Sequence, residues 1–583
     1  MVDGLRDAAE ALALADLAEA EASRDVVGFA SAIRRIMEWP QDAATMAHLS
    51  GRVMASGLTP IRIHLVCEPD SAMMRDATVC FAAGDGLLAS ITQGHFAETP
   101  PGDAAFVVIL PPQPYDQTAT EMVAGVQALS QAAQDAGAGH VLIADWPAAS
   151  IASSIADRAA PNGSAARTLQ ANLALREALQ AQQTQHVLDR SGTASAVSGP
   201  WADPRLSLMH GGPAPGAGAA FALGREISRW VRAATGRARK LIVTDLDGVL
   251  WGGVLGEDGF NGVHLGPDGP GAAYQMLQRH LAAAHRDGAM LGIVSRNAPS
   301  DVEEMLSSHP GMVLRRDQFS AVHAGWRPKT EVIHQVAEQL SAAPNAVLVL
   351  DDDPTERLMI RGSLPEVTVP DSATDPLALS QHLQCMGWTD DLTTTAEDRL
   401  RTSARATPAK AAKPADLATL QMHGTILTGR NIPVDRALQL ARRVTQFNAT
   451  GRSLSADRLA NLTKDDDPMA AVLHLTDHFS DLGRIGLVAL QRDQDDVIIT
   501  DLLISCRALQ RGVDTVLLNW AAGAAREQGA IRLIGEIVET PRNLPVRDLY
   551  QRHGFDEVAD QPGRWSVPLT TAPVFAPHTI TLD

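Results

Sequence analysis

Two groups of aspartates have the spacing to do chemistry. Asp245 and Asp247 follow the apolar run LIVT. A second apolar run, VLVL, leads into Asp351, Asp352 and Asp353. Acids two positions apart on a strand point to the same side, and buried like charges are costly unless they are paired or bind a metal. Mg²⁺ prefers carboxylate oxygens and keeps waters that a phosphate can displace. We therefore predict a Mg²⁺ site whose ligands are Asp245, Asp247, Asp351 and Asp352.

Polar and basic residues lie between the two acidic groups. Ser295 follows the apolar run LGIV and is followed by Arg296 and Asn297, and Lys329 lies in the sequence WRPKT. A hydroxyl and an ammonium group can bind phosphoryl oxygens and balance their charge. Active sites of parallel sheets lie at the carboxyl ends of the strands. We predict that Ser295, Arg296, Asn297 and Lys329 bind phosphate there.

The order Asp-x-Asp, Ser, Lys, Asp-Asp resembles the haloacid dehalogenase superfamily of phosphohydrolases. The resemblance implies that Asp245 attacks phosphorus and that Asp247 acts as acid and base, through an aspartyl-phosphate that splits the reaction into two steps. The alternative is that these acids are solvated turn residues. The gaps between the motifs leave no room for a large cap domain. An uncapped site suggests a macromolecular substrate, or a lid lent by another domain.

A more specific resemblance is to the FkbH-like proteins. It rests on DLDGVLWGGVLGEDG, IVSRNAPSDVEEML, GWRPKTEVI, TQFNATGRSLSADRL and ETPRNLPVRDLYQRHGF, and covers about residues 240–556. Asp353 and Val249 stand where relatives commonly have Asn and Thr, and neither replaces an expected nucleophile. The resemblance implies a glyceryltransferase-phosphatase that takes 1,3-bisphosphoglycerate, dephosphorylates it and loads the glyceryl group on the phosphopantetheine thiol of an acyl carrier protein. The product would feed polyketide-type biosynthesis.

The C-terminal part resembles the GNAT acyltransferase fold, through LYQRHGF and SCRALQRGVD. In the second motif, the resemblance places pantetheine binding at Arg507, Gln510 and Gly512. Gln510 replaces a glycine of the GNAT pattern and obstructs close approach of the backbone to a phosphate. Acetyl-CoA binding is therefore in doubt, whereas a pantetheine arm with one phosphate could fit.

Cys506 is the candidate nucleophile for acyl transfer. It lies beside Arg507 at the end of an apolar strand and before a helix, and both features favour a thiolate. The alternative is a small buried core cysteine. His423, His474 and His478 are candidate bases that no spacing distinguishes. Asn448, Glu536 and Asn543 match recurrent FkbH-like positions, where they could line the acyl site or cap turns.

The elements that must position these residues predict an α/β multidomain protein. Apolar strand-like runs alternate with Ala-rich helical stretches from residue 58, which is typical of parallel sheets. Residues 190–220 are expected to form a long loop, and residues 366–370 a last strand. The expected domains are a helical segment 1–57, a degenerate SGNH-hydrolase-like α/β domain 58–236, a haloacid dehalogenase-like phosphatase without a large cap 237–393, a linker 394–417, an α+β GNAT-like domain 418–572 and a tail 573–583.

The N-terminal α/β domain departs from the SGNH pattern. Cys67 and Glu68 stand where that family has Gly-Asp-Ser, and Asp203 and His210 have the wrong spacing for its late Asp-x-x-His. We therefore expect docking or scaffolding there rather than hydrolysis. Cys67, Cys80 and Cys385 show no zinc-site spacing.

Composition limits the partners. The chain has 583 residues, 45% hydrophobic, and a formal net charge of −19, which disfavours nucleic acid and anionic membranes. Four cysteines and the lack of a signal peptide or spanning segment indicate a cytoplasmic protein. Because carrier proteins are typically acidic, we predict a basic docking patch from Arg442, Arg443, Arg452, Arg507 and Arg511.

Two other functions remain open at this point. One is a Mg²⁺-dependent phosphatase of a free metabolite joined to a GNAT domain that acylates an amine. The other is a non-catalytic scaffold with a vestigial phosphatase and an inactive last domain.

Overall fold

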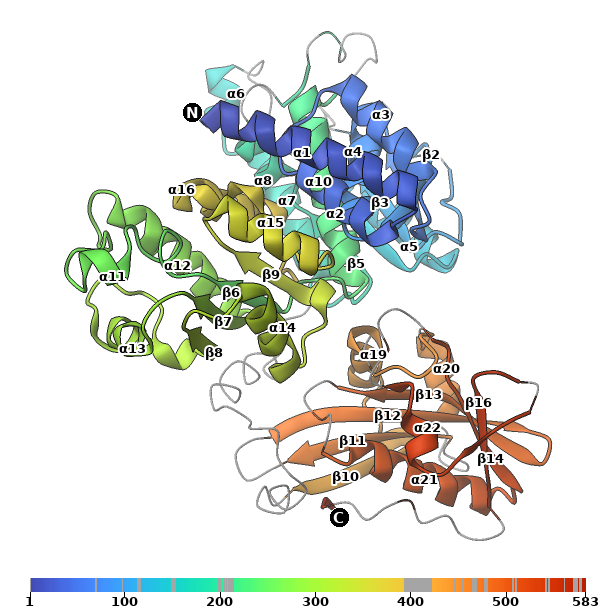
Figure 1. Ribbon diagram of the computed structural model, residues 1–583. Helices are drawn as coiled ribbons and strands as arrows, with labels where there is room; N and C mark the ends of the chain where they lie inside the picture. The colour runs from blue at the N-terminus through green and yellow to red at the C-terminus, as the bar shows by residue number, and fades with distance from the viewer. Residues whose placement is uncertain are drawn as a thin grey trace. The chain divides into compact units, whose positions relative to one another are not determined.

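The computed structural model (Figure 1) describes most of the chain. It leaves out residues 1, 69–70, 97, 113–116, 148–153, 198–200, 204, 206, 208–213, 393–421, 445–446, 453, 464–468, 477–480, 506–507, 509–510, 540–542, 544–545, 560, 570–574, 576–578 and 583. Two compact units divide the chain, one formed by residues 1–238 and 353–392 and the other by residues 239–352 and 393–583. The predicted linker, residues 394–417, lies outside the described residues. The other predicted domain bounds stay predictions.

A parallel sheet forms the centre of the first unit. Its five described strands have the order β2-β1-β3-β4-β5, and every neighbouring pair is parallel. The middle strand β3 is buried along its whole length, as expected for a strand covered on both faces. The strands are β1 (Thr59–Cys67), β2 (Leu87–Gly94), β3 (Phe106–Leu110), β4 (His140–Ala144) and β5 (Gln185–Leu188).

Helices precede, connect and follow these strands. They are α1 (Val2–Ser23), α2 (Val26–Ile36), α3 (Ala43–Met54), α4 (Ala72–Gly84), α5 (Ala119–Asp135), α6 (Ile155–Ala159), α7 (Ser164–Leu179), α8 (Arg190–Ala196) and α10 (Ala217–Ala234). Helices α4 and α10 pack closely, because a Cβ added at Gly224 would lie 2.6 Å from the Cβ of Ala77. The expected loop over residues 190–220 is wrong at both ends. Asp189 caps α8 by accepting from the amide of Gly192, and α10 begins at Ala217.

The segment 353–392 belongs to this first unit through buried ion pairs. It contains α15 (Pro354–Ser363) and α16 (Pro376–Met386). Asp371 lies between them, 3.1 Å from Arg35 Nε of α2 and 2.5 Å from Arg361 Nη2. The strand expected at residues 366–370 is absent from the named strands of the described structure. The segment is flanked by prolines, and Arg361 Nη2 donates to the carbonyl of Val369 at 2.7 Å.

Glu38 makes this cluster sensitive to pH. Its Oε2 accepts from the amide of Asp371 at 2.8 Å, and burial, followed by the nearby charge of Asp371, raises the pKa of Glu38 to about 8. The neighbouring His382 has a pKa lowered to about 3 by burial, so it is neutral above pH 6.5 in both the folded and unfolded chain. Between pH 6.5 and 8, Glu38 therefore holds a proton when folded and loses it on unfolding.

We expect the free energy of unfolding of the first unit to fall between pH 6.5 and 8, because the folded state binds more protons than the unfolded state. The slope that Glu38 contributes should be about 1.4 kcal/mol per pH unit at most. Denaturant unfolding of Glu38→Gln should lack this contribution, while the exposed control Glu19→Gln keeps it. Equal slopes for wild type and Glu38→Gln would contradict the assignment.

The second unit begins with another parallel sheet. Its four described strands have the order β8-β7-β6-β9, and each pair is parallel. All residues of β6 and β9 are buried. The elements are β6 (Leu241–Thr244), α11 (Leu255–Asp258), α12 (Gly271–Arg286), β7 (Met290–Ser295), α13 (Pro299–Ser308), β8 (Phe319–Ala324), α14 (Lys329–Gln339) and β9 (Val347–Leu350).

The C-terminal part is built on a larger, mixed sheet. Its eight described strands have the order β15-β16-β14-β13-β12-β11-β10-β17, and β13 and β14 are a parallel pair. The elements are β10 (His423–Thr428), α19 (Val434–Arg443), α20 (Ala456–Leu462), β11 (Ala470–Thr476), β12 (Asp481–Asp493), β13 (Asp496–Ile504), α21 (Val513–Glu527), β14 (Arg532–Glu536), α22 (Leu549–Arg552), β15 (Asp556–Glu557), β16 (Arg564–Pro568) and β17 (Thr581–Leu582).

Strands β13 and β14 separate beyond their first residues. They pair only from Asp496 to Ile499 on β13. Farther along, the segment 447–449, which we name the insert, bonds to both sides. Its Ala449 donates to the carbonyl of Leu502 at 3.2 Å and accepts from the amide of Val538 at 2.9 Å. The insert therefore takes the place of a strand between β13 and the residues that follow β14.

Candidate active site

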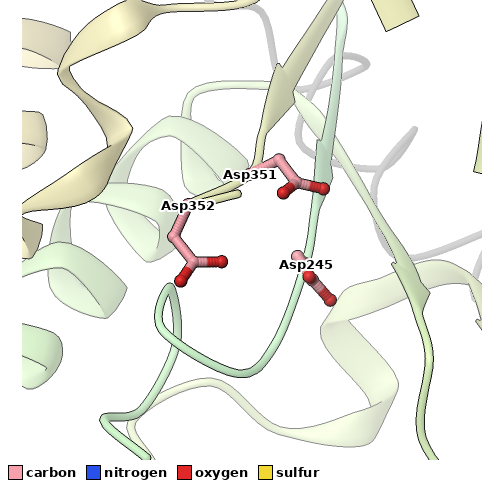
Figure 2. Close-up of side chains that lie close together, drawn as sticks. All are labelled: Asp245, Asp351 and Asp352. Carbon is pink, nitrogen blue, oxygen red and sulfur yellow. The ribbon is translucent and has the colours of Figure 1, made fainter. Parts of the chain in front are cut away.

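Three carboxylates meet at the carboxyl ends of β6 and β9. Asp245 directly follows β6, and Asp351 and Asp352 directly follow β9, its parallel neighbour. One oxygen from each lies within 4.8 Å of the others, and Figure 2 shows the three side chains facing one another. The parallel pairing explains the meeting, because Thr244 and Leu350 are register partners and the next residue of each strand leaves the sheet at the same edge.

Lys329 balances part of this negative charge. It is the first residue of α14, is 5% exposed, and its Nζ lies 2.5 Å from Asp245 Oδ2 and 2.6 Å from Asp351 Oδ2. Burial alone would lower the pKa of Lys329, but the two carboxylates raise it above its ordinary value. One ammonium against three carboxylates leaves an excess of negative charge in a place where uncompensated charge is costly.

The effect of this excess negative charge is clearest at Asp352. Burial, followed by the charges of Asp245 and Asp351, raises the pKa of Asp352 to about 6. Its carboxylate lies against Gly248, where a Cβ would come within 2.0 Å of Oδ2, and Gly248 has a φ of +72°. Only glycine therefore suits this turn. The site offers oxygen ligands, an excess of negative charge and a carboxylate that resists ionisation. A Mg²⁺ ion would balance that charge, so the residues fit this metal.

Asp247 has a different environment from the other three acids. Its Oδ1 accepts from Trp251 Nε1 at 2.7 Å and from the amide of Leu255 at 3.0 Å. Its Oδ2 accepts from Asn297 Nδ2 at 2.9 Å. The side chain is thus held in one orientation and lies outside the three-carboxylate group. Its role as a metal ligand stays a prediction. Asn297 is the one hydrogen-bond partner of Oδ2 among the described residues, which leaves a lone pair that can carry a proton.

The predicted phosphate-binding residues lie at the end of the neighbouring strand β7. Ser295 is its last residue and is 3% exposed. Asn297 is 5% exposed and donates from Nδ2 to Ser295 Oγ at 3.1 Å as well as to Asp247. Arg296 is exposed. The structure therefore joins Ser295, Asn297 and Asp247 in one hydrogen-bonded group, and phosphate binding by Arg296 stays a prediction.

The predicted acyl-transfer residues are only partly described. Cys506, Arg507 and Gln510 lie outside the described residues. Gly512 precedes α21 with a φ of +81°, which favours glycine. Of the candidate bases, His474 Nε2 lies 2.8 Å from Asp481, His423 is exposed, and His478 is not described.

Asn448 and Asn543 come together at the insert. Asn448 Oδ1 accepts from the amides of Thr450 and Gly451, at 3.2 and 2.8 Å. The buried Asn543 donates from Nδ2 to the carbonyls of Asn448 and Val538, at 3.0 and 2.9 Å. These contacts are those of residues that fix a turn and hold the insert in place.

Glu536 and the predicted basic patch are also linked. Arg564 lies 2.8 Å from the Glu536 carboxylate, and Arg452 lies 3.5 Å from it. Arg452 is thus partly neutralised, and Arg511 is partly buried with partners of its own. The side chains of Arg442, Arg443 and Arg507 are not described. The basic patch stays a prediction.

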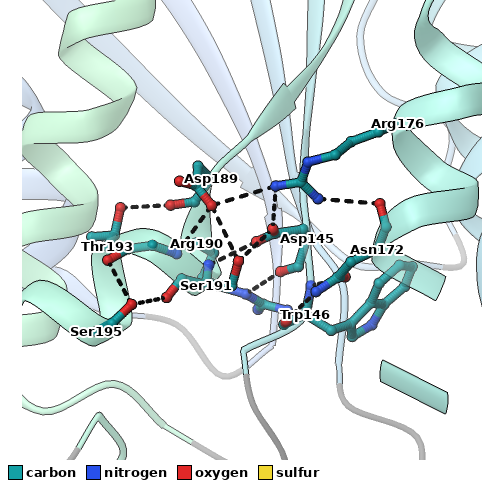
Figure 3. Close-up of polar contacts among 10 residues, drawn as sticks. Asp145, Trp146, Asn172, Arg176, Asp189, Arg190, Ser191, Thr193 and Ser195 are labelled. Atoms are coloured by element: carbon teal, nitrogen blue, oxygen red, sulfur yellow. Dashed lines mark hydrogen bonds and ion pairs between the residues drawn. The ribbon is translucent and has the colours of Figure 1, made fainter. Parts of the chain in front are cut away.

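A separate polar cluster lies after β4 and β5 of the first unit (Figure 3). The fully buried Asp145 accepts from the amide and the hydroxyl of Ser191, at 2.7 and 2.6 Å, and from Arg176 Nη2 at 2.8 Å. Arg190 donates to the carbonyls of Asp145 and Pro111. Both Asp145 oxygens are thus bonded within the fold, and the cluster joins the ends of two strands.

Comparisons with known proteins bear on the fold. Neither a family model nor a curated protein matches the chain. Among solved structures, the N-terminal part of BF1531 from Bacteroides fragilis, which contains a phosphatase domain and is complexed with Mg, has a TM-score of 0.52 at 17% identity. The match covers 62% of this chain and 98% of that one. The two chains share a fold. That likeness extends beyond the predicted phosphatase domain, which is well under half of the chain.

The C-terminal part has weaker counterparts. The ribosomal-protein-S18-alanine N-acetyltransferase from Escherichia coli has a TM-score of 0.20 at 16% identity, over 26% of this chain and 96% of that one. The GNAT domain of S. lividans PAT has a TM-score of 0.20 at 18% identity, over 26% and 94%. Such scores carry no weight here, and the description of this part rests on its own mixed sheet. No helix in the described part of the chain is long and apolar enough to cross a bilayer.

Proposed function

We propose that the chain is a bifunctional glyceryltransferase and phosphatase. It takes 1,3-bisphosphoglycerate, dephosphorylates it and loads the glyceryl group as a thioester on the phosphopantetheine thiol of an acyl carrier protein, for polyketide-type biosynthesis. The observation that carries the phosphatase half is the meeting of Asp245, Asp351, Asp352 and Lys329 at one edge of a parallel sheet. The transfer half rests on the resemblance of residues 240–556 to FkbH-like proteins.

The residues suggest how phosphate is removed. The carboxylate of Asp245 attacks phosphorus and forms an aspartyl-phosphate, while the bond to the leaving oxygen breaks and that oxygen takes a proton from Asp247. Asp247 then takes a proton from water, which attacks phosphorus and releases phosphate. The hydrogen bonds from Trp251, Leu255 and Asn297 hold Asp247 in place for both steps. Ser295 and Lys329 bind the phosphoryl oxygens. A Mg²⁺ ion held by Asp245, Asp351 and Asp352 would screen the negative charges of carboxylate and phosphate.

The proposed transfer uses Cys506 as the acyl acceptor. Its thiolate attacks the carbonyl carbon of the acyl phosphate, the carbon–oxygen bond to phosphate breaks, and phosphate leaves. The carrier's thiol then attacks the resulting thioester, and Cys506 leaves as a thiolate. A neighbouring arginine and a helix start favour the thiolate form.

Cys506→Ala should therefore form no covalent glyceryl-enzyme. Intact mass spectrometry after incubation with the acyl phosphate checks this, with Cys385→Ala as a control cysteine in the other unit. A covalent glyceryl adduct on Cys506→Ala would show that another residue is the acceptor.

One experiment separates the proposal from its alternatives. The full chain is incubated with Mg²⁺, 1,3-bisphosphoglycerate and a holo-carrier protein, and released phosphate and carrier mass are measured together. Phosphate release with a glyceryl gain on the carrier supports the proposal. Phosphate release without carrier modification favours a phosphatase of a free metabolite, and no turnover favours a scaffold.

A further inference from the structure

A buried carboxylate in the C-terminal part belongs neither to the aspartate cluster of the phosphatase site nor to the predicted acyl-transfer residues. Asp501, on β13, is 1% exposed, and neither of its oxygens accepts a hydrogen bond from a residue that the structure describes. Arg458 Nη2, from α20, lies 3.1 Å from Oδ2 as an ion pair. The charge is thus partly balanced, but the acceptor positions of the carboxylate are unused. Burying unused acceptors is costly, and more so when the group is charged. A ligand that donates hydrogen bonds would recover this cost.

The surroundings of Asp501 place it at an irregular point of the sheet. The pairing of β12 with β13 shifts register between Ala489 and Leu490, next to Asp501. Ile499 is the last β13 residue paired with β14, and Leu502 is the first that bonds to the insert. Asp501 therefore lies where β13 and β14 separate. Irregularities such as β-bulges are frequent next to functional sites.

The hydroxyls of Thr450 and Thr500 do not supply the missing donors. The hydroxyl of Thr450 donates to the carbonyl of Thr500, and that of Thr500 donates to the carbonyl of Ala489, at 3.3 and 3.2 Å. Tyr550 is fully buried, and burial, followed by the charges of Glu536 and Asp501, raises the pKa of its hydroxyl above the ordinary value. The site thus combines a carboxylate with unused acceptors and a neutral phenol.

We propose that Asp501 is a specificity-determining residue that accepts hydrogen bonds from adjacent hydroxyls of a small, uncharged acyl group. The inference rests on the proposed function, and it specifies which acyl group the transfer site prefers. A vicinal diol offers one donor to each carboxylate oxygen and adds no charge. An alkyl acyl group leaves both oxygens without a hydrogen-bond donor. A phosphorylated acyl group brings a second anion to a site with one described counter-charge, Arg458. A glyceryl group has the required pair of hydroxyls once its phosphate is gone.

Binding of stable analogues tests this without any transfer chemistry. The probes are pantetheine amides of the glyceryl, propionyl and 3-phosphoglyceryl groups, titrated into the full chain by calorimetry. The wild type should bind the glyceryl amide at least about tenfold more tightly than either of the others, since hydrogen bonds to a charged group are worth about 1.5–3 kcal/mol and 1.4 kcal/mol is tenfold. Asp501→Asn should lose most of the preference for glyceryl over propionyl. Asp496→Asn, which changes an ion-paired carboxylate on the same strand, should keep it.

The inference is overturned if the wild type binds the glyceryl and propionyl amides equally, binds none of the three, or prefers the phosphorylated one. It is also overturned if folded Asp501→Asn keeps the full preference. The wild-type comparison decides the matter even if that variant does not fold. Carrier loading is scored separately. A glyceryl preference without loading would refute the proposed function and leave the hydroxyl site, and loading without a preference would refute only the role of Asp501.

Discussion

Asp245→Asn should abolish hydrolysis of the phosphate ester of 1,3-bisphosphoglycerate and leave only the phosphate that Cys506 displaces from the acyl phosphate. An amide cannot attack phosphorus as a carboxylate does, so no aspartyl-phosphate forms. Loss of a nucleophile costs several orders of magnitude in rate, and we expect a fall of at least about a thousandfold. The change is nearly isosteric, and Lys329 keeps its contact with Asp351 at 2.6 Å. The fold should therefore survive, and the measurement is steady-state hydrolysis of the phosphate ester with saturating Mg²⁺.

Asp301→Asn is the matched control for this variant. Asp301 lies on α13, the helix that follows β7 of the same sheet. It is exposed and accepts a hydrogen bond from the hydroxyl of the neighbouring Ser300. Its rate of phosphate release should equal that of the wild type. Persistent hydrolysis of the phosphate ester by Asp245→Asn, at a rate near that of the control, would defeat the assignment of the nucleophile.

Lys329→Met should destabilise the second unit in the absence of divalent metal. Met has a similar volume but no charge, so Asp245 and Asp351 would be left buried with no counter-charge at Nζ. Removing one partner of a buried ion pair costs about 3–5 kcal/mol. We expect a loss in this range when unfolding is measured by denaturant in EDTA. Added Mg²⁺ should recover part of it, because the metal would restore positive charge beside the same carboxylates.

Arg327→Met tests whether the effect is specific to the buried cation. Arg327 is 60% exposed on its side chain and lies 3.6 Å from Glu331, so its loss should change the free energy of unfolding by about 0.5 kcal/mol or less. If Lys329→Met is as stable as Arg327→Met in EDTA, the buried charge balance described for this site is wrong.

Much of the sheet edge that carries the aspartates could be predicted from the sequence. The runs before Asp245 and Asp351 are short and apolar, and acids follow them at once. This pattern is typical of buried parallel strands with a site at their carboxyl ends. That pattern predicted the approach of Asp245, Asp351 and Asp352 across β6 and β9. The position of Lys329 between the two acidic groups was also visible in the sequence. Its contact with both Asp245 and Asp351 could not be predicted, because it depends on where α14 begins.

Other features could not be read from the sequence. Strand β2 is partly exposed and strand β8 is half-buried toward its end, so neither shows a continuous apolar run. Residues 366–370 looked like a strand because of their valines, yet prolines flank them and Arg361 binds their backbone. The orientation of Asp247 by Trp251 required knowledge of the turn between them. The sequence does carry a signal for Asp501, a lone acid within the apolar run of β13.

The central claim is that one chain removes phosphate and passes the acyl group to a carrier. Its most direct test is the intact mass of a holo-carrier protein after incubation with the full chain, Mg²⁺ and 1,3-bisphosphoglycerate. The account predicts a gain of one glyceryl unit without phosphate on the carrier, and no gain of that unphosphorylated unit with Asp245→Asn. A carrier of unchanged mass alongside continued phosphate release would contradict it.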